Sequence, residues 1–430
     1  GVFLFLTVRC VVAKETTNQT LGTLLGLIVW LTPTIYNLLS TTYVDVAVAF
    51  YSFLGLVTLI EGFQQEKASP FLASGILIGC AIGIKYLGFA SLVALLGVWF
   101  YQVMVSPMKS QSVRNFACWI MGLVLCGSYW YVRNWLLTGN PVFPFFGQMF
   151  GAQVGGSNYH LYGLGKSFFD FISVFFTMFY IPSAFGAFVS RIGIFYFLLL
   201  PFALIAFIMV RKARPYFIFF IGFMVSWFFL CQAHRYVIPA LPVLSVLGGK
   251  GAFWVYQFSS LDLKRVLQQL SGAAGLILLI YLTSGIYHYR HEYVLFLGRW
   301  TPSEYLLKME RTTPIAKWIN EHLALNSRLL LEAEPNQFYI DRDIVRDAFL
   351  KIRTGYDQQG MELDQFEKFL KSIQITHVLL SDPVGKKKPV GVESLIRRIS
   401  NSNKAKEIYS VESQNIRDLR YHYRLYQLQI

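Results

Sequence analysis

The sequence predicts a mostly α-helical protein, a polytopic bundle of about ten transmembrane helices followed by a small C-terminal α/β domain. Hydrophobic residues make up 55% of the 430 residues and charged residues only 14%, with a mean hydropathy of +0.46. Soluble proteins carry about 25% charged residues, so much of this surface must meet a non-aqueous solvent. Apolar runs recur from Gly1 to His288 and then stop, which separates a membrane domain (1–290) from a soluble domain (291–430).

The apolar runs define the individual spans, because a helix needs about 20 mostly apolar residues to cross the hydrocarbon core of a bilayer. In chain order the predicted spans are roughly 1–13, 20–38, 46–61, 70–87, 89–104, 115–132, 192–210, 216–231, 237–257 and 270–288.

The charged loops between the spans set the orientation. Five of them fall in alternate positions and must share a side: 14–15, 61–67, 109–114, 211–214 and 262–265. Their basic excess makes that side the cytoplasm. The remaining loops, and everything after His288, are then extracytoplasmic. We therefore expect a multi-pass protein of the plasma (inner) membrane with its soluble domain outside.

The outer segment 133–191 is too long to be a plain connection. Residues 135–165 are rich in Gly, Pro, Asn and aromatics, which disfavour regular helix. Residues 166–191 are aromatic-rich with a single acid, Asp170, a composition typical of helices lying among lipid headgroups. A loop of this length in a compact protein is usually functional or disordered, and its aromatic content argues against disorder.

The soluble domain has alternating strand and helix patterns, which favour a small layered α/β fold. Helices are predicted at 313–323 and 363–373. Strands are predicted at 328–332 and 376–380, with weaker strand signals at 408–411 and 423–428.

The formal net charge of +14 is explained by topology rather than by nucleic-acid binding, which we do not expect. The five cysteines lie in or beside apolar runs without paired spacing, so they indicate no redox compartment. The chain opens at Gly1 inside an apolar run, with no Met and no basic n-region, which suggests a fragment lacking its original N-terminus.

Acidic side chains are scarce in the membrane domain. Only six precede Glu292, and the predicted topology leaves two of them, Asp45 and Asp170, on the outer face. Asp45 follows a polar stretch and opens an apolar run, so it is either a helix N-cap or a site carboxylate, and the two roles are compatible. Asp170 is interpreted as structural.

Several cations stand at the outer ends of the spans. Lys85 lies inside an apolar run, where it either extends to the interface without a partner or serves as counter-charge for a lipid phosphate. The other outer cations occur in Arg133-Asn134 and in His234-Arg235-Tyr236. They are either interface anchors or anion ligands, since the Arg fork suits phosphate. Lys85, Arg133 and Arg235 together form a phosphate-site pattern.

Standard catalytic motifs do not occur in the sequence: there is no Walker loop, HExxH, Cys-pair zinc spacing or nucleophile elbow. Asp341-Arg342-Asp343 resembles an acidic metal motif, but we interpret it as a structural turn of the soluble domain. No metal ligands are predicted, and a dependence on divalent metal is left open.

The order of these elements resembles the membrane-embedded GT-C glycosyltransferases. It is closest to the bacterial group that includes the lipid A aminoarabinose transferase, protein O-mannosyltransferases and Rgt-type proteins (ArnT/PMT-like). The matching stretches are Pro33 through Tyr43-Val44-Asp45, Gly83-Ile84-Lys85-Tyr86, Tyr131-Val132-Arg133-Asn134 with Gly139-Asn140-Pro141, and His234-Arg235-Tyr236 with Pro239 and Pro242. The resemblance covers nearly the whole chain.

The resemblance implies a glycosyltransferase that moves a sugar from a polyprenyl-phosphate donor to a lipid, glycan or protein acceptor on the outer face. In such proteins a carboxylate acts as base and cations stabilise the departing phosphate. The family's principal catalytic Asp lies in the first outer loop, which here would precede Gly1, so Asp45 would be a supporting acid. The substrate-binding residues would be Lys85, Arg133, Asn134, His234, Arg235 and Tyr236.

Two other functions remain open at this point. A transporter or flippase of lipid-linked saccharides would often show internal repeats and broken helices near the midplane. No repeat is visible in the sequence, and the cations gather at the outer interface. A polymerase or ligase of surface polysaccharide shares the carrier-lipid chemistry. The expected partners are membrane lipids, a lipid-linked sugar donor and an acceptor that the sequence does not identify.

Overall fold

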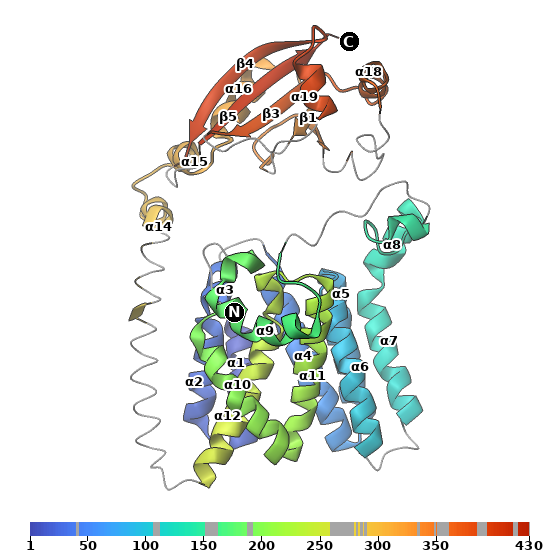
Figure 1. Ribbon diagram of the computed structural model, residues 1–430, viewed down its shortest axis with the longest axis vertical. Helices are drawn as coiled ribbons and strands as arrows, with labels where there is room; N and C mark the ends of the chain where they lie inside the picture. Colours follow the sequence, from blue (N-terminus) through green and yellow to red (C-terminus); the bar gives the residue numbers. More distant parts are fainter. Residues whose placement is uncertain are drawn as a thin grey trace. The chain divides into compact units, whose positions relative to one another are not determined.

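The computed structural model describes residues 1–39, 43–105, 112–150, 162–186, 192–258, 279–280, 283, 287, 290–332, 336–347, 350, 361–384, 394–415 and 420–429 (Figure 1). The chain divides into two compact units. The helical unit comprises Gly1–Val142 and Asn158–Ser284, and the sheet unit comprises Phe143–Ser157 and Gly285–Ile430.

The helical unit is a bundle of apolar helices. They are α1 (Val2–Thr16), α2 (Gln19–Trp30), α3 (Pro33–Leu39), α4 (Asp45–Gln65), α5 (Ala68–Ile84), α6 (Gly88–Val105), α7 (Ser112–Gly127), α8 (Tyr129–Thr138), α9 (Phe168–Tyr180), α10 (Ile194–Met209), α11 (Arg214–Leu230) and α12 (Ala240–Gln257). Short 3₁₀ helices include η3 (Pro182–Phe185) and η5 (His234–Val237).

Consecutive spans run in alternate directions. Gly26 of α2 packs on Phe5 of α1, and Gly62 of α4 packs on Phe71 of α5, so both pairs are antiparallel. The bundle therefore has two ends, which we name by their residues. The Asp45 end holds the start of α4, the end of α5 and η5, and the Glu61 end holds the last turns of α1 and α4. An ion pair of 2.7 Å between Lys14 and Glu61 joins two of the loops that the sequence places on one side.

Helices occupy every predicted span as far as residue 257, which confirms the polytopic helical fold class. Among the described residues, three helices are long and apolar enough to cross a membrane, namely Asp45–Gln65, Gly88–Val105 and Arg211–Leu230, and two bent pairs raise the number to as many as five. The helices Ala68–Ile84, Phe168–Tyr180 and Phe195–Met209 are apolar but shorter. The tenth predicted span, 270–288, falls almost entirely outside the described residues.

Two predicted spans are bent rather than straight. The span at 20–38 breaks by 64° between α2 and α3, where Pro33 starts the second helix, as expected for a residue without a backbone N–H. The span at 115–132 bends by 57° between α7 and α8 at Ser128, and α8 continues to Thr138. The prediction that residues from 135 onward disfavour helix is therefore wrong for the first four, and a left-handed Gly139 ends the helix there.

Glycines allow a close contact between α5 and α7. Gly75, Gly79 and Gly83 repeat every fourth residue on α5 and face the backbone of α7. A Cβ atom at Gly75 would lie 2.0 Å from the Trp119 carbonyl oxygen, which no side chain can accept. Small residues at this spacing are the usual means by which membrane helices approach closely.

Part of the outer segment forms the apolar helix α9. Asp170 completes a capping box with Ser167 at its first turn, which confirms the structural interpretation of this acid. Gln232, at the end of α11, accepts a hydrogen bond of 2.6 Å from the Leu164 backbone and donates one to the Gly165 carbonyl oxygen. The segment before α9 is thereby tied to the bundle.

The sheet unit is a three-layer α/β sandwich. Its strands are β1 (Arg328–Glu332), β2 (Asp343–Arg346), β3 (His377–Pro383), β4 (Ala405–Gln414) and β5 (Arg420–Leu428), in the order β2-β1-β3-β5-β4. The β1–β2 and β1–β3 pairs are parallel, whereas β5 pairs antiparallel with β3 and β4. Its helices are α14 (Arg290–Phe296), α15 (Pro302–Met309), α16 (Thr313–His322), α18 (Leu363–Ser372) and α19 (Leu395–Ser400).

Alternation along the strands builds two cores. Leu329, Leu331 and Leu379 face α16, while Leu330, Val378 and Leu380 face α18 and α19. The strands and helices predicted in this domain are confirmed, and β2, α14, α15 and α19 are additional. Asp341-Arg342-Asp343 is confirmed as structural. Arg342 bonds the Leu323 carbonyl oxygen, and Asp343 pairs with Arg328 at 2.8 Å.

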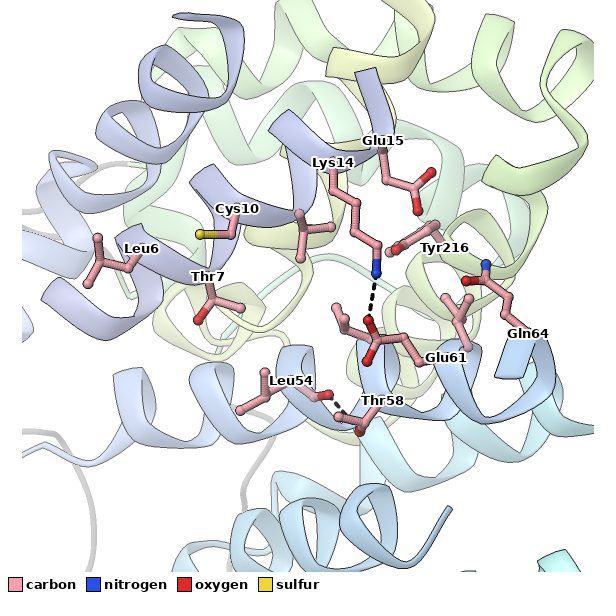
Figure 2. A pocket seen from close by; sticks show the side chains of 13 residues that line it. Leu6, Thr7, Cys10, Lys14, Glu15, Leu54, Thr58, Glu61, Gln64 and Tyr216 are labelled. Carbon is pink, nitrogen blue, oxygen red and sulfur yellow. Dashed lines mark hydrogen bonds and ion pairs between the residues drawn. The ribbon is translucent and has the colours of Figure 1, made fainter. Parts of the chain in front are cut away.

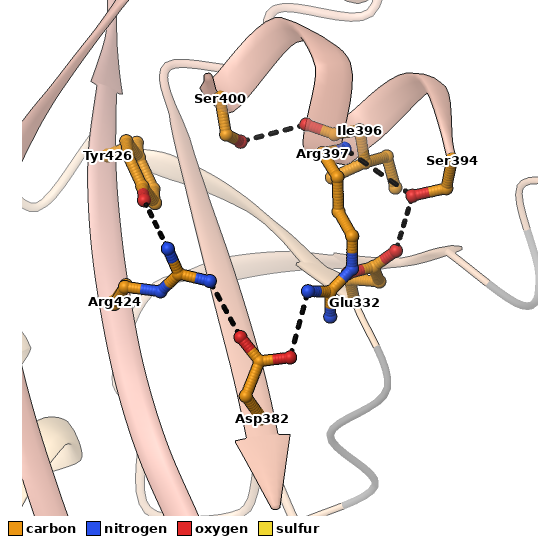
Figure 3. A network of polar contacts seen from close by, with 8 residues as sticks. All are labelled: Glu332, Asp382, Ser394, Ile396, Arg397, Ser400, Arg424 and Tyr426. Atoms are coloured by element: carbon orange, nitrogen blue, oxygen red, sulfur yellow. Dashed lines mark hydrogen bonds and ion pairs between the residues drawn. The ribbon is translucent and has the colours of Figure 1, made fainter. Parts of the chain in front are cut away.

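One polar network crosses the carboxyl ends of β1 and β3 (Figure 3). Arg397 pairs with Glu332 at 2.7 Å and with Asp382 at 2.8 Å, and Arg424 pairs with the other Asp382 oxygen at 2.6 Å. Ser394, the N-cap of α19, donates a hydrogen bond of 2.6 Å to Glu332. The network joins α19 to three strands and leaves neither carboxylate without a cationic partner.

Candidate functional site

The candidate site lies at the Asp45 end of the helical unit. Asp45 is the first residue of α4, whose N-cap is Val44, so the interpretation of Asp45 as an N-cap is wrong. Its side chain is fully buried and forms an ion pair of 2.6 Å with the Lys85 ammonium. Lys85 ends α5 with an extended backbone, and the chain then turns into α6 so tightly that a Cβ at Gly88 would lie 2.6 Å from the Ala81 backbone. Local structure thus fixes both partners.

Two tyrosines connect this pair to Arg235. The Lys85 ammonium lies 4.1 Å from the centre of the Tyr236 ring. The Arg235 guanidinium lies 4.2 Å from the Tyr43 ring and donates a hydrogen bond of 3.4 Å to the Tyr236 hydroxyl. Both cations therefore rest on aromatic faces, which attract positive charge at this range. Asp45, Lys85, Arg235, Tyr236 and Tyr43 form what we call the Asp45 cluster.

The Asp45 cluster carries an excess of positive charge, since two cations share one carboxylate. Lys85 retains 23% of its side-chain exposure, and Arg235 is partly exposed, so both can reach an anion. Burial lowers the pKa of Arg235, but its contacts with Tyr236, Tyr43 and Asp45 outweigh burial and raise the pKa above its ordinary value. Asp45 Oδ2 is buried and has no hydrogen-bond partner in the described part of the chain. Most buried polar atoms in proteins have a hydrogen-bond partner, so this oxygen remains able to accept a hydrogen bond.

His234 stands beside the Asp45 cluster but does not add a charge to it. It is buried, and burial lowers its pKa from 6.5 to about 4, so the imidazole is neutral near pH 7. Nδ1 lies 3.5 Å from the Thr34 hydroxyl of α3. His234 thereby links the bent α2–α3 span to η5.

Arg133 and Asn134 have different surroundings in the structure. Asn134 donates a hydrogen bond of 3.2 Å to the hydroxyl of Tyr86, the residue after Lys85. Tyr131 donates one of 2.7 Å to the Ile82 carbonyl oxygen, so α8 is fastened to the turn that holds Lys85. Arg133 is exposed and lies 5.6 Å from the Trp130 ring, which favours the interface-anchor interpretation for this residue.

The sequence analysis missed a second buried charge in the helical unit. Lys250 of α12 is 4% exposed and forms a short ion pair with Glu15 at the Glu61 end. It stands in an apolar run, and the cost of an intramembrane cation, which singled out Lys85, would have identified it as well. Tyr43 was not among the predicted site residues, although it stands only two residues before Asp45, the first residue of α4.

No metal site is evident in the part of the chain that the structure describes. No group of three or more His, Cys, Asp or Glu side chains there could hold an ion. The chemistry that the Asp45 cluster offers is electrostatic, because it holds two cations and one carboxylate at one end of the helix bundle.

Comparison with known proteins shows the fold. No family model matches the chain. An uncharacterised protein of Shigella flexneri is 26% identical over 153 residues, which is 32% of this chain and 72% of that protein. The crystal structure of ArnT from Cupriavidus metallidurans, bound to undecaprenyl phosphate, matches with a TM-score of 0.54 at 14% identity, covering 98% of this chain and 82% of that one.

The chain is thus a polytopic membrane protein that carries a small α/β unit at its C-terminal end. Its fold is similar to that of ArnT, as the sequence resemblance led us to expect.

Proposed function

We propose that this protein is a glycosyltransferase that uses a polyprenyl-phosphate-linked sugar as donor. The Asp45 cluster supports the proposal most directly, since it sets two cations on a fold shared with a protein crystallised with undecaprenyl phosphate. In this proposal Lys85 and Arg235 bind the donor phosphate. Asp45 is the supporting acid that holds Lys85, and Tyr236, His234 and Asn134 position the cations.

The charge balance suits phosphate departure. The donor is a phosphodiester with one negative charge, which the net +1 of Asp45, Lys85 and Arg235 neutralises. In the reaction the acceptor hydroxyl oxygen attacks the anomeric carbon, and its proton passes to a base. The bond from carbon to phosphate oxygen breaks, and the phosphate leaves with a second negative charge. Cations fixed beside that oxygen gain attraction as the charge develops, which lowers the barrier.

The side of the membrane follows from the same proposal. We place the Asp45 cluster and residues 291–430 on the extracytoplasmic face of the plasma membrane, with the membrane domain ending near 290. Residues 133–191 would then be an extracytoplasmic interfacial segment. Membrane-impermeant thiol labelling of single cysteines at Tyr162 and at Lys67 tests this placement, since only the first should react in intact cells.

Binding of undecaprenyl phosphate tests the phosphate site without knowledge of the sugar or acceptor. Lys85→Ala and Arg235→Ala should each weaken binding by about 10- to 100-fold, because each removes a charged hydrogen bond worth about 1.5–3 kcal/mol. Asp45→Asn should abolish glycan transfer with a smaller loss of binding, since it frees Lys85 from its position. Native mass spectrometry of the detergent-purified protein measures the binding.

Arg133→Ala is the matched control, because Arg133 is an outer cation that contacts Trp130 instead of the Asp45 cluster. It should bind like the wild type. Binding of undecaprenyl phosphate by the Lys85 and Arg235 variants with the same affinity as the wild type would contradict the proposal. If the protein, reconstituted in vesicles, moved a lipid-linked sugar between the two leaflets without forming a glycosylated product, it would be a flippase instead.

A further inference from the structure

A cavity of about 370 Å³ lies between α1 and α4 towards the Glu61 end of the helical unit (Figure 2). Its two walls are the facing surfaces of these helices, and Tyr216 of α11 contributes to the lining. The Asp45 cluster stands at the opposite end of α4, so this cavity belongs to a different site. We call it the α1–α4 groove.

The α1–α4 groove changes character along its length. Leu6 and Leu54 line one part, and Lys14, Glu61 and Gln64 line the other (Figure 2). Eight residues separate Leu6 from Lys14, which is about 12 Å along a helix. A membrane lipid has the same order of parts, with an apolar chain leading to a polar headgroup.

The charges at the polar part of the groove are not all equally available. Glu15 is held by buried Lys250. Lys14 and Glu61 form the other pair at 2.7 Å, with side-chain exposures of 64% and 30%. An exposed ion pair contributes only about 0–1 kcal/mol, so a ligand that satisfies both partners can open it at little cost. Such a ligand must present a cation to Glu61 and an anion to Lys14.

We propose that the α1–α4 groove binds a zwitterionic phospholipid with a primary-ammonium headgroup, such as phosphatidylethanolamine. One acyl chain lies along the apolar part, the ammonium bonds Glu61, and the phosphate bonds Lys14. The Lys14 contact already demonstrates that the Glu61 carboxylate accepts a primary ammonium at 2.7 Å. A trimethylammonium has no N–H donor and cannot make this bond. An anionic headgroup would leave Glu61 unpaired beside its own negative charge.

Competition between lipids of identical acyl chains tests the headgroup preference. Native mass spectrometry should show wild-type protein binding phosphatidylethanolamine at least tenfold more tightly than phosphatidylcholine or phosphatidylglycerol, as one charged hydrogen bond provides. Glu61→Gln should lose this preference and favour phosphatidylglycerol, because Lys14 is then unpaired. Glu66→Gln is the matched control, since Glu66 is exposed on the next turn and does not line the groove.

A photoreactive phosphatidylethanolamine, with a diazirine in its acyl chain, tests the location. Adducts should concentrate on residues 6–11 and 54–61, and Thr58→Trp should remove them by filling the groove. Val93→Trp, on an exposed part of α6, should leave them unchanged. Equal binding of the three lipids by the wild type would overturn the proposal. So would adducts spread evenly over the exposed helices, as expected if another helix or a second copy fills the groove. Neither result affects the phosphate site at the opposite end.

Discussion

At the scale of single residues, the helical unit separates two kinds of buried charge. Lys85 pairs with Asp45 and keeps part of its side chain exposed, whereas Lys250 is buried and pairs with Glu15. A cation in an apolar interior is expensive unless it is paired or reaches water. Lys85 is therefore a candidate for ligand binding, whereas Lys250 is expected to stabilise the packing of α12 against α1 through its pair with Glu15.

The Lys250–Glu15 pair predicts a non-additive effect on stability. Lys250→Met or Glu15→Gln alone should lower the free energy of unfolding by about 3 kcal/mol, because each leaves one buried charge without its partner. The double variant should recover most of that loss. Thermal unfolding of the four proteins in one detergent measures the cycle, and additive losses would show that the two side chains are not coupled.

His234 predicts a dependence of stability on pH. Its pKa is about 4 in the folded protein against 6.5 when free, so the unfolded chain binds more protons between these values. The stabilisation is complete above pH 6.5 and is lost as the pH falls towards 4. A shift of this size amounts to about 3 kcal/mol.

His234→Gln should therefore flatten the decrease in unfolding temperature between pH 7 and pH 4.5. A glutamine does not titrate but keeps a polar atom near Thr34. An unchanged pH profile in this variant would show that His234 is not the titrating group. Binding of undecaprenyl phosphate at pH 7 should weaken less than in Lys85→Ala or Arg235→Ala, because the neutral imidazole positions the cations without contributing a charge.

The sequence singled out four of the five residues that the structure groups in the Asp45 cluster. Asp45, Lys85 and Arg235 stand out because charges are rare in apolar runs. The contact between Asp45 and Lys85 depends on antiparallel packing of two helices, and the contact of Arg235 with Tyr43 joins η5 to the residues just before α4. Neither contact appears in local patterns. Arg133 and Arg235 are both predicted outer cations beside aromatic residues, but Arg133 lies exposed on α8 and contacts Trp130, whereas Arg235 lies in η5 and contacts Tyr43.

At the scale of helices and strands, length and hydrophobicity predicted the spans but not their shape. Pro33 was visible in the sequence, yet the 64° bend depends on where the helix meets its neighbours. The bend at Ser128 could not be predicted from a proline, because none lies between residues 112 and 138. In the sheet unit, β2 was missed because Asp343 and Arg346 leave only two apolar residues between them.

The glycine seam between α5 and α7 carries a prediction at this scale. Gly75→Ala places a methyl group 2.0 Å from a backbone oxygen, so the helices must separate, at a cost of about 1–3 kcal/mol. Gly97→Ala is the control, since its Cβ would meet only the Ile218 side chain at 3.5 Å. The unfolding temperature should fall for the first variant and stay within error for the second. Equal temperatures would mean that the seam can open freely.

At the scale of the whole molecule, the two units have separate hydrophobic cores. We therefore expect unfolding in two steps that respond to different substitutions. Arg397→Ala should lower only the transition of the sheet unit, by about 3 kcal/mol, because it leaves Glu332 and Asp382 with fewer cationic partners (Figure 3). Gly75→Ala should lower only the transition of the helical unit. Scanning calorimetry of the full chain separates the two, and a single shared transition would refute the expectation.

The β4 strand has a further consequence for proteins held at high density in a bilayer. It is ten residues long and stands at the edge of the sheet, where unpaired backbone groups can template the strand of a neighbouring copy. Its pairing with β5 is interrupted by a bulge between Glu407 and Tyr409, and charged Lys406 and Glu407 are exposed beside it. The bulge and the charged residues disfavour edge-to-edge pairing of β4 with a neighbouring copy, so the sheet units should not aggregate through this strand.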